Sequence, residues 1–408
     1  MKQAQRPAAV LLSPVMPATE QCGRSWRAWQ WLQDLNGAFA VHLVVIGRNV
    51  IPPPAYLPAA SLHQPHVDRR LCQRAVRCLG IAAPWLAGRW PHLVIDALML
   101  RDPQALASDL RVAIGSAQLA RMVVFRQSLT ACSVELAAQL NPRQLDLDLD
   151  DLESTTRQSV AGALWRLGRL HAAAVMRASA VQYRSLERQL ASPLSPWNQL
   201  WLASADDVGA LRGRLPTTRI ATRQNQPPAN LLSMPPPSGD RPARLLFVGS
   251  LGYAPNQEAV LWLVEHVLPA LMQRSDQLWQ LDVVGRAPPT WLQSRLTAAP
   301  RVCLHADAPQ VTPFYQNARL VVVPLHSGGG TKLKTLEAVA HGRAVVSTHE
   351  GLRGLALECG RHCLCAEQPE AFAAAIDQLL ERPALAEQLA QAARRAVSDL
   401  STASKLAM

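Results

Sequence analysis

Short apolar runs alternate along the chain with longer segments whose apolar residues recur at helical spacing. In the first half, the apolar runs lie at residues 9–13, 39–46, 92–96, 121–125 and 199–204. Each run is short and lacks polar alternation, which is typical of strands buried on both faces of a parallel sheet. Because helical segments separate the runs, the pattern predicts a doubly wound α/β sheet with helices on both faces.

A proline-rich stretch interrupts this alternation. Residues 223–243 read RQNQPPANLLSMPPPSGDRPA, and their six prolines cannot sustain the interior of a helix or a strand. Beyond them, a helix is predicted from about Asn256, and apolar runs return at 244–250, 279–285, 301–305, 318–325 and 343–348. We therefore expect two doubly wound, Rossmann-like domains joined by a linker.

The expected limits are 1–222 for the first domain, 223–243 for the linker and 244–385 for the second domain. A C-terminal helix, 386–408, is expected to follow and can return toward the first domain. Ligands of open α/β sheets bind beyond the carboxyl ends of the strands, so two such domains predict a central cleft between them.

Composition narrows the class of protein. With 49% hydrophobic and 17% charged residues, the chain of 408 residues is globular and not disordered. A net charge of +11 favours a polyanionic partner, such as nucleic acid, an anionic membrane face or a phosphate-bearing substrate. No apolar run approaches the roughly 18 residues that a membrane-spanning helix needs, and no signal peptide is evident at the start.

The eight cysteines are scattered, which predicts no disulfide framework and a reducing cytoplasm. Three of them share the stretch CGRHCLC, residues 359–365. That spacing suggests a metal site, but HCLCA also reads as a buried strand with Cys363 and Cys365 on one face. Since no second ligand pair at zinc-like spacing follows, we expect no bound metal and no cofactor.

The candidate chemistry lies in HSGGGTKLKTLEAVAHG, residues 326–342, where a glycine-rich loop follows an apolar run and precedes a helix. Glycines let backbone N–H groups approach an anion, and a helix N-terminus adds unpaired donors. Two of only four lysines in the chain, Lys332 and Lys334, fall here and supply positive charge.

Two further residues extend this interpretation. Thr331 can cap the helix or hydrogen-bond a phosphate oxygen. Glu337 lies in the second turn, where its carboxylate can accept hydrogen bonds from two ribose hydroxyls. The glycine spacing fits neither a Walker loop nor a dinucleotide fingerprint. The stretch therefore predicts a cradle for a nucleoside diphosphate, with an ordinary glycine-rich turn as the alternative.

Residues 245–271 and 321–355 resemble the C-terminal half of family 4 glycosyltransferases of the GT-B fold, and most of all the bacterial exopolysaccharide-associated subgroup. Residues 11–32 resemble, more loosely, the first strand and glycine turn of that family. LDLDDLES, residues 147–154, resembles an acidic motif of the subgroup. The resemblance implies that the two expected domains face a central cleft.

The resemblance also implies roles for individual residues. Lys334, assisted by Lys332, would neutralise the donor diphosphate, and Glu337 would bind ribose. Gly23 would lie in the glycine turn of the first domain, close to the donor phosphates and the acceptor. The remaining donor-binding residues would be Gly328, Gly329, Gly330 and Thr331 in the loop, with Gly249 and Asn256 in the facing loop.

Two departures from the family pattern matter. Broad family members carry a first glutamate eight residues before the second, where this chain has Gly329. The loop 249–256, GSLGYAPN, lacks the arginine and lysine found in many members. The diphosphate charge would then fall to Lys332 and Lys334, or to arginines across the cleft such as Arg27 and Arg126. HADAPQ, residues 305–310, leaves the nucleobase open.

The acidic stretch 146–151 contains overlapping Asp-x-Asp spacings, which in another glycosyltransferase fold hold a metal ion. Strand alternation places Asp146, Asp148 and Asp150 on one face, and Asp150 with Glu153 fits a capping box. We favour capping, together with an acceptor-side role for Asp150 or Asp151, over metal binding.

Two basic or aromatic segments could contact an anionic membrane. Residues 156–190, predicted as one helix, carry six arginines, and residues 24–35 carry three tryptophans: Trp26, Trp29 and Trp31. The simpler interpretations are a solvated helix face and tryptophans that pack a helix onto its sheet. No aromatic-interleaved recognition module appears, so nucleic acid is not an expected partner.

The expected activity is transfer of a sugar from a nucleotide diphosphate sugar to a saccharide or lipid-linked acceptor in exopolysaccharide or cell-surface glycan biosynthesis, with retention of configuration. Lys334, Glu337 and Asp150 are the expected catalytic residues. The expected location is cytoplasmic, with peripheral contact to the inner membrane face as an open alternative. A nucleotide-sugar 2-epimerase of the same fold and a non-catalytic nucleotide-sugar-binding or interaction protein are the rivals. The sugar, the base, the acceptor and the oligomeric state stay open.

Overall fold

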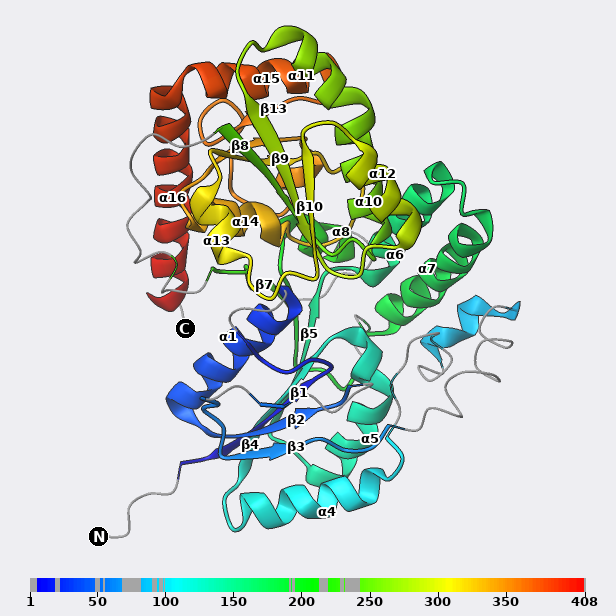
Figure 1. Ribbon diagram of the computed structural model, residues 1–408. Coiled ribbons are helices and arrows are strands. Elements are labelled where there is room, and N and C mark those ends of the chain that lie inside the picture. Colours follow the sequence, from blue (N-terminus) through cyan, green and yellow to red (C-terminus); the bar gives the residue numbers. More distant parts are fainter. Residues whose placement is uncertain are drawn as a thin grey trace. The chain divides into compact units, whose positions relative to one another are not determined.

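The chain divides into two compact units, each a parallel sheet with flanking helices (Figure 1). The first unit comprises Met1–Gln158 and Ala174–Asn225, and the second comprises Ser159–Ala173 and Gln226–Met408. This computed structural model describes residues 6–18, 23–47, 52–53, 56–67, 82–89, 94, 98, 100–190, 192, 195–212, 219–227, 231 and 243–406.

The first unit contains a seven-stranded parallel sheet in the order β3-β2-β1-β4-β5-β6-β7. Its strands are β1 (Ala8–Ser13), β2 (Ala40–Val45), β3 (Ser61–His63), β4 (Leu119–Phe125), β5 (Gln144–Asp150), β6 (Gln199–Leu202) and β7 (Ile220–Thr222). The chain starts in the middle of the sheet, builds one side and then returns to build the other. The reversal lies between β1 and β4, and ligands of such sheets bind at the carboxyl ends of the strands at this point.

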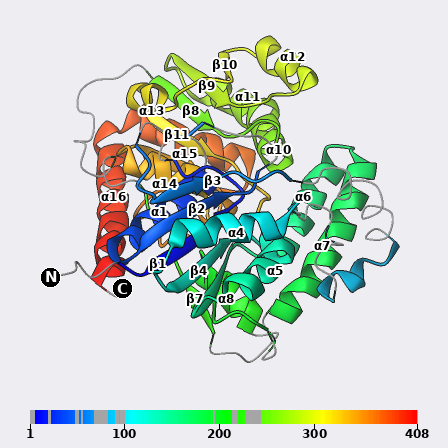
Figure 2. The same cartoon turned by 90° about the horizontal axis from the view of Figure 1, so that it is seen from below.

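Alternate residues of β1 supply both halves of the core of the first unit. Ala9 and Leu11 pack on one face with Trp31 and Leu32 of α1 (Gly23–Ala38). Ala8, Val10 and Leu12 belong to the larger cluster on the other face. That face is covered by α4 (Pro103–Ile114), α5 (Thr130–Leu140), α7 (Leu170–Leu190) and α8 (Ala205–Arg212) (Figure 2). Burial on both faces explains why β1 is apolar without alternation.

The segment predicted as one helix over 156–190 forms two helices, so that prediction is wrong. α6 (Glu153–Arg166) ends before Gly168, which adopts a left-handed φ of 70°, and α7 begins at Leu170. The N–H of Arg169 donates to the carbonyl of Leu164 at 2.8 Å. This bond satisfies a terminal carbonyl of α6 and reverses the chain, which favours glycine at the left-handed position.

The second unit contains a six-stranded parallel sheet in the order β10-β9-β8-β11-β12-β13. Its strands are β8 (Ala243–Val248), β9 (Trp279–Gly285), β10 (Val302–Ala306), β11 (Leu320–Val323), β12 (Ala344–Ser347) and β13 (Leu364–Cys365). The chain again starts centrally, and the reversal lies between β8 and β11. The loops after these two strands therefore begin side by side.

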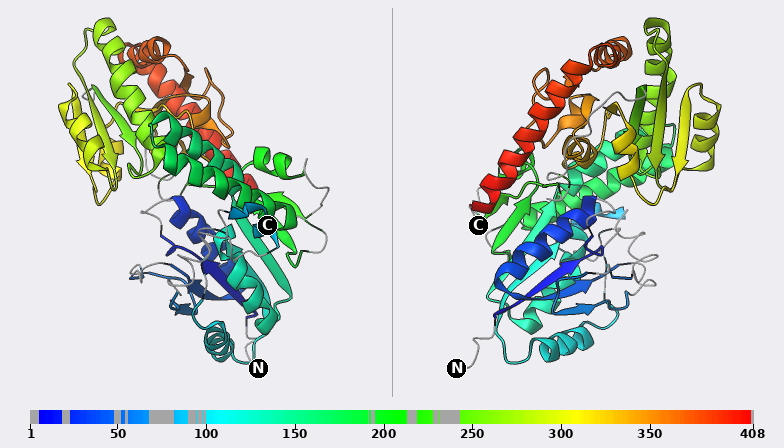
Figure 3. Two further views of the ribbon diagram at one scale, coloured as in Figure 1. Left: turned by 90° about the vertical axis from the view of Figure 1, so that its right-hand side faces the viewer. Right: turned by 60° about the vertical axis from the view of Figure 1, so that its left-hand side comes forward.

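Helices flank this second sheet as well. They are α10 (Ala254–Trp262), α11 (Leu268–Arg274), α12 (Thr290–Ala298), α13 (Thr312–Asn317), α14 (Leu333–Ala340), α15 (Pro369–Glu381) and α16 (Pro383–Leu406). α14 packs against α16, and α11 packs against α15. α16, red in Figure 3, is one long helix that starts at a proline, where the missing N–H removes no helical hydrogen bond.

Nine of the ten predicted strands correspond to observed ones within a few residues. Most of the tenth, 92–96, and most of the predicted linker lie outside the described residues, so the predicted domain limits stay predictions. The short strands β3 and β7 were not predicted. HCLCA forms only the two-residue β13, and both of its residues are half-buried. Trp26 and Trp31 are buried in the first unit, which confirms the packing interpretation for these two side chains.

Candidate functional site

A glycine-rich loop leaves the carboxyl end of β11 and enters α14 in the second unit. Gly328 and Gly330 adopt φ values of 124° and 62°, which L-residues with side chains rarely adopt. The loop after β8, which starts at Gly249, lies beside it, because β8 and β11 are paired neighbours. The predicted strand–loop–helix arrangement is therefore present, and it lies at the chain reversal of the sheet.

Thr331 presents a buried hydroxyl whose Oγ1 has no hydrogen-bond partner among the described residues. The cap position of α14 is occupied by Lys332, without a side-chain cap bond. The capping role suggested for Thr331 is therefore not realised. A buried hydroxyl without a partner costs about 1–3 kcal/mol, so its position here points to a ligand that accepts a hydrogen bond from it.

The backbone donors of the loop are partly used. The N–H of Gly328 donates to Ser159 Oγ at 2.8 Å, and Ser159 belongs to the second unit. For the N–H groups of Gly329 and Gly330, no protein acceptor lies within the part of the chain that the structure describes. Two amides and one hydroxyl thus remain available to an anion.

Lys334 is the cation best placed to meet that anion. Its Nζ donates to Asn256 Oδ1 at 2.7 Å and lies 4.6 Å from the centre of the Phe247 ring. Asn256 is fixed in turn, because its Nδ2 donates to the carbonyl of Ser250 at 2.8 Å. A Cβ on Gly249 would come within 2.7 Å of Nζ, so glycine is needed there for the lysine to reach this place.

Burial makes the charge of Lys334 costly. Desolvation, helped by the neighbouring Lys332, lowers the pKa of Lys334 to about 7, although Glu337 acts in the opposite direction. Among the described residues no carboxylate forms an ion pair with Lys334, and its neutral partner Asn256 leaves the charge uncompensated. A bound diphosphate would supply the missing negative charge.

Glu337 lies one turn further along α14. It accepts a hydrogen bond from Tyr315 Oη at 3.0 Å. Burial raises the pKa of Glu337 to about 7, although the Tyr315 hydrogen bond and Lys334 oppose the shift. Tyr315 is fully buried and stacks on His341, with ring centres 4.7 Å apart. Tyr315 was not predicted, because it comes from a different helix, α13.

Lys332 differs from Lys334 in being neutralised already. Its Nζ forms an ion pair with Glu350 at 2.8 Å and donates to the carbonyl of Gly329 at 3.2 Å. Glu350 follows β12, the strand beside β11. The expected assistance of Lys332 to the diphosphate stays a prediction, but this geometry assigns it the structural role of tying the glycine loop to the next loop of the sheet.

The entry to the loop is fixed by a second carboxylate. Ser327 Oγ donates to Glu258 Oε2 at 2.6 Å, and Arg166 pairs with the other oxygen of Glu258. Arg166 and Ser159 both lie on α6, seven residues apart and therefore on the same helix face. Glu258, Arg166 and Ser159 were not predicted, because their relation to the loop is not visible in the local sequence.

In the first unit, Arg27 is buried and all its nitrogens are engaged. Its Nε and Nη2 donate to the two oxygens of Asp148 at 2.6 and 2.8 Å. Its Nη1 donates to the carbonyl of Arg223 and to Asn225 Oδ1 at 2.8 and 2.9 Å. Four of the five N–H donors of the guanidinium are therefore used within the protein, and the diphosphate role suggested for Arg27 stays a prediction.

Arg126 is paired with three carboxylates. Its Nη1 lies 3.0 Å from Asp150 Oδ2 and 2.5 Å from Asp151 Oδ1, and its Nη2 pairs with Glu153. Burial raises the pKa of Asp151, but Arg126 and a hydrogen bond from Thr156 outweigh burial and lower it to about 2. Asp151 is thus a permanent anion that holds Arg126 in place.

Asp150 is bound by Arg126 and by Arg27, whose Nε lies 3.5 Å from its Oδ1. The expected capping box is therefore wrong: the N–H of Asp150 donates to Asp148 Oδ1 at 2.9 Å rather than to Glu153, whose carboxylate pairs with Arg126. Asp150 and Arg126 both have a positive φ, 65° and 82°. Such strained residues cluster at functional sites.

The other predicted residues of the first unit are two aspartates that form ion pairs with arginines, and a glycine at the start of a helix. Asp146 pairs with Arg121, and Asp148 pairs with Arg27, so arginines occupy the oxygens that a metal would need. Gly23 is the first residue of α1, and the turn before it, 19–22, lies outside the described residues.

Comparison with known proteins bears on the second unit. Residues 242–382 match the profile of the family described as Glycosyl transferases group 1. The second unit is thus similar to a glycosyl transferases group 1 domain. The glycine loop, Lys334 and Glu337 all lie within the matched residues. No curated protein matches the chain in sequence.

Solved structures resemble the whole chain. A glycosyltransferase from Rickettsia africae gives a TM-score of 0.64 at 10% identity, over 97% of this chain and 94% of its own. Sucrose-phosphate synthase from Thermosynechococcus elongatus gives 0.61 at 17% identity, over 97% and 95%. HepE from Anabaena, solved with UDP and glucose, gives 0.58 at 13% identity, over 96% and 95%.

At such identities the likeness shows the fold alone. The prediction of two Rossmann-like domains of the GT-B fold is confirmed. Among the helices that the structure describes, none is both long enough and apolar enough to cross a membrane.

Replacing Thr331 with valine tests the unpartnered hydroxyl. We expect Thr331→Val to keep or increase the free energy of unfolding, since it removes an unpaired buried polar atom, and to weaken nucleoside diphosphate binding about three- to tenfold. Thr290→Val, at an exposed position of α12 in the same unit, should change neither quantity. Urea unfolding and titration calorimetry measure the two effects. A variant that loses stability but keeps its affinity would contradict the assignment.

Replacing Arg27 tests the buried charges of the first unit. Arg27→Met leaves Asp148 and Asp150 without their shared partner, which should lower the free energy of unfolding of that unit by about 3–5 kcal/mol. Arg244→Met removes a partly exposed partner of Asp282, with 38% of the arginine side chain accessible, and should cost about 0–1 kcal/mol. Equal losses in urea unfolding would show that Arg27 is not the structural centre of its cluster.

Proposed function

We propose that the chain is a glycosyltransferase that takes a sugar from a nucleotide diphosphate sugar and transfers it to a hydroxyl of a saccharide or lipid-linked acceptor. The observation that supports the donor most strongly is the uncompensated Lys334 beside an unpartnered Thr331 hydroxyl at the chain reversal of the second sheet. A diphosphate satisfies both groups at once. HepE, solved with UDP and glucose, shares the fold and supports the same donor class.

Each donor-side residue has a distinct proposed task. The free amides of Gly329 and Gly330, with the Thr331 hydroxyl, donate hydrogen bonds to the phosphate oxygens, and Lys334 neutralises their charge. As the sugar–phosphate bond breaks, negative charge grows on the leaving diphosphate, and fixed amides and an ammonium group stabilise that charge without a metal ion. The Glu337 carboxylate accepts hydrogen bonds from the ribose hydroxyls. Gly249 and Asn256 keep Lys334 in position.

The acceptor side is proposed for the carboxyl end of the first sheet. Asp150 and Arg126 lie there with strained backbones, and the Asp150 side chain keeps some exposure, 14%. We assign Asp150 to orientation of the acceptor hydroxyl, with the departing phosphate as the base and retention of configuration. Asp151, Arg126 and Arg27 hold Asp150 in place, and Gly23 opens the helix beside it.

The proposed function includes a cellular location and a pathway. The function fits exopolysaccharide or cell-surface glycan assembly in a bacterial cytoplasm, with the basic chain making peripheral contact with the inner membrane face. The net charge of +11 supports attraction to anionic lipids and to charged donors.

Nucleotide affinity should depend on pH with a maximum near 7. Lys334 must be an ammonium to hold the diphosphate, so affinity falls as pH rises above its free pKa of about 7. Glu337 must be a carboxylate to accept ribose hydroxyls, so affinity also falls as pH drops below its free pKa of about 7. On either side of the maximum, the nucleotide affinity can fall about tenfold per pH unit.

Glu337 variants separate the two limbs. Glu337→Gln should abolish the acid-side fall and keep the alkaline one, and Glu337→Ala should weaken binding by about 1–3 kcal/mol. Calorimetry between pH 6 and 8.5 measures both effects. A flat wild-type profile, or unchanged affinity in a folded Glu337→Ala chain, would remove Glu337 from the site.

The function itself is tested in two steps. A thermal-shift screen against UDP, GDP, ADP, CMP and dTDP sugars identifies the donor, since selective binding stabilises the chain by mass action. The selected donor is then incubated with membrane lipid and saccharide acceptors, and products are separated by mass spectrometry. Transfer to an acceptor is the expected result. Free epimerised sugar nucleotide would indicate a 2-epimerase, and no shift at millimolar nucleotide would contradict donor binding altogether.

A further inference from the structure

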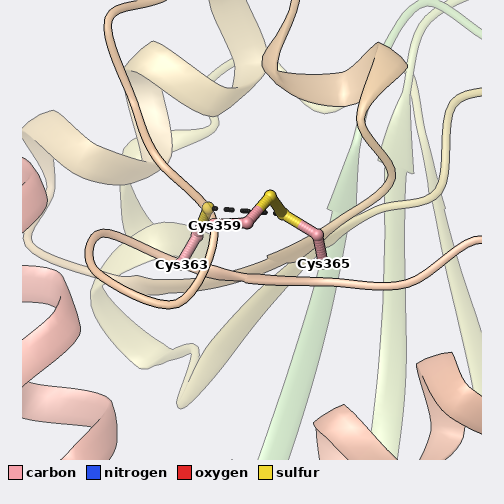
Figure 4. A group of neighbouring side chains, drawn as sticks. All are labelled: Cys359, Cys363 and Cys365. Carbon is pink, nitrogen blue, oxygen red and sulfur yellow. Dashed lines mark hydrogen bonds between the residues drawn. A yellow bond between two sulfur atoms is a disulfide. The ribbon is translucent and has the colours of Figure 1, made fainter.

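Three cysteines converge on the loop between β12 and β13, apart from the residues assigned to the donor. Cys359 and Cys365 form a disulfide, and Cys363 Sγ lies 3.9 Å from Cys365 Sγ (Figure 4). All three sulfur atoms lie within 4.8 Å of one another. Nothing in the proposed sugar transfer uses them.

The backbone holds these sulfurs together independently of the disulfide. Cys359 and Cys363 form an isolated β-bridge, and the N–H of Gly360 donates to the carbonyl of Cys363 at 2.7 Å. Gly360 adopts a φ of 81°, which lets the chain turn tightly between them. Cys365 lies on β13, in register with Ser347 of β12. The loop and the sheet thus bring three thiols to one point.

The spacing of the sulfurs matches the geometry of a thiolate metal site. With a zinc–sulfur bond of about 2.3 Å, two ligands of a tetrahedral zinc ion lie about 3.8 Å apart. The distance of 3.9 Å between Cys363 Sγ and Cys365 Sγ is close to this value. Cys359 reaches a comparable distance once its bond to Cys365 is broken, because its β-bridge to Cys363 keeps it beside the loop.

We propose that the reduced chain binds one zinc ion through Cys359, Cys363 and Cys365, with water as the fourth ligand. The disulfide and the metal site are alternatives, since they use the same sulfurs. A dithiol reductant transfers two electrons and two protons to the Cys359–Cys365 disulfide. The protein then carries two free thiols, and the reductant has become a disulfide. Zinc then displaces the protons of the three thiols, including that of the buried Cys363, whose pKa burial raises to about 11.

A second group of potential ligands is less suited to a cation. Asp282, Cys303 and His305 also lie close together, but Asp282 already pairs with Arg244 at 2.7 Å and with His305 at 2.9 Å. A metal there would compete with a guanidinium. The three-cysteine group has no cationic partner among the described residues, and it provides three soft sulfur ligands, which favour zinc.

The proposed ion would also stabilise the neighbouring donor loop. The loop between β12 and β13 carries Glu350, the partner of Lys332. The metal would restrict residues 359–365, whose last residue pairs with β12, the strand that precedes Glu350. This effect is structural, and zinc takes no part in the sugar transfer.

The test uses the full chain, reduced with a phosphine and desalted without oxygen. Zinc is titrated in competition with a chromophoric chelator, and cadmium is titrated while the ultraviolet thiolate-to-metal charge-transfer band is recorded. We expect one tightly bound ion per reduced chain, a charge-transfer band for three thiolates and no tight binding by the oxidised chain. X-ray absorption of the zinc form should show three sulfur ligands at about 2.3 Å.

Variants locate the ion. Cys363→Ser should weaken binding at least tenfold and reduce the charge-transfer band, whereas Cys303→Ser, in the other ligand group, should retain one tightly bound ion. Circular dichroism establishes that both variants are folded. Absence of tight binding by the reduced wild-type chain, or equal binding by Cys363→Ser, would overturn the proposal. Loss of the ion in Cys303→Ser would place it at the other group and would also overturn it.

Discussion

The pairing of β8 with β11 is the constraint on which the candidate donor site depends. These strands are separated by two strands in the sequence, yet they lie side by side because the chain begins the second sheet at its centre. Their loops therefore start at the same edge, which lets Lys334, on the helix after β11, reach Asn256 after β8. With a different strand order, the glycine-rich turn and Lys334 would not lie beside the loop after β8 that contains Asn256.

The basic residues proposed from the sequence to neutralise the diphosphate differ in whether a carboxylate already compensates their charge. Arg27, Arg126 and Lys332 are all cations near a sheet edge, but each already has a carboxylate partner. Within the described part of the chain, Lys334 has an amide oxygen and a neighbouring aromatic ring but no carboxylate, and its burial makes the unpaired charge costly. A bound anion interacts most favourably with a cation that has no carboxylate partner. The missing carboxylate partner of Lys334, rather than the number of basic residues, therefore defines the proposed diphosphate site.

Sequence patterns predicted the fold well because the central strands of both sheets are buried on both faces and follow one another at regular intervals. The glycine turn and its helix were also predictable, since Gly328 and Gly330 need conformations that few other residues adopt. Side-chain partners were not. Arg27 meets Asp148 across 121 residues and Asn225 across 198 residues, and no local pattern reveals such contacts. The break at Gly168 was visible in principle, but the flanking helical periodicity outweighed a single glycine.

The central claim is that the turn between β11 and α14 binds the diphosphate of a sugar nucleotide. Hydrogen–deuterium exchange of the full chain, with and without the nucleotide selected by thermal shift, measures this directly. The account predicts slower amide exchange in peptides covering residues 326–337 and 249–256, because bound phosphate occupies the free N–H groups of the loop. Protection confined to other segments, or none at saturating nucleotide, would contradict it.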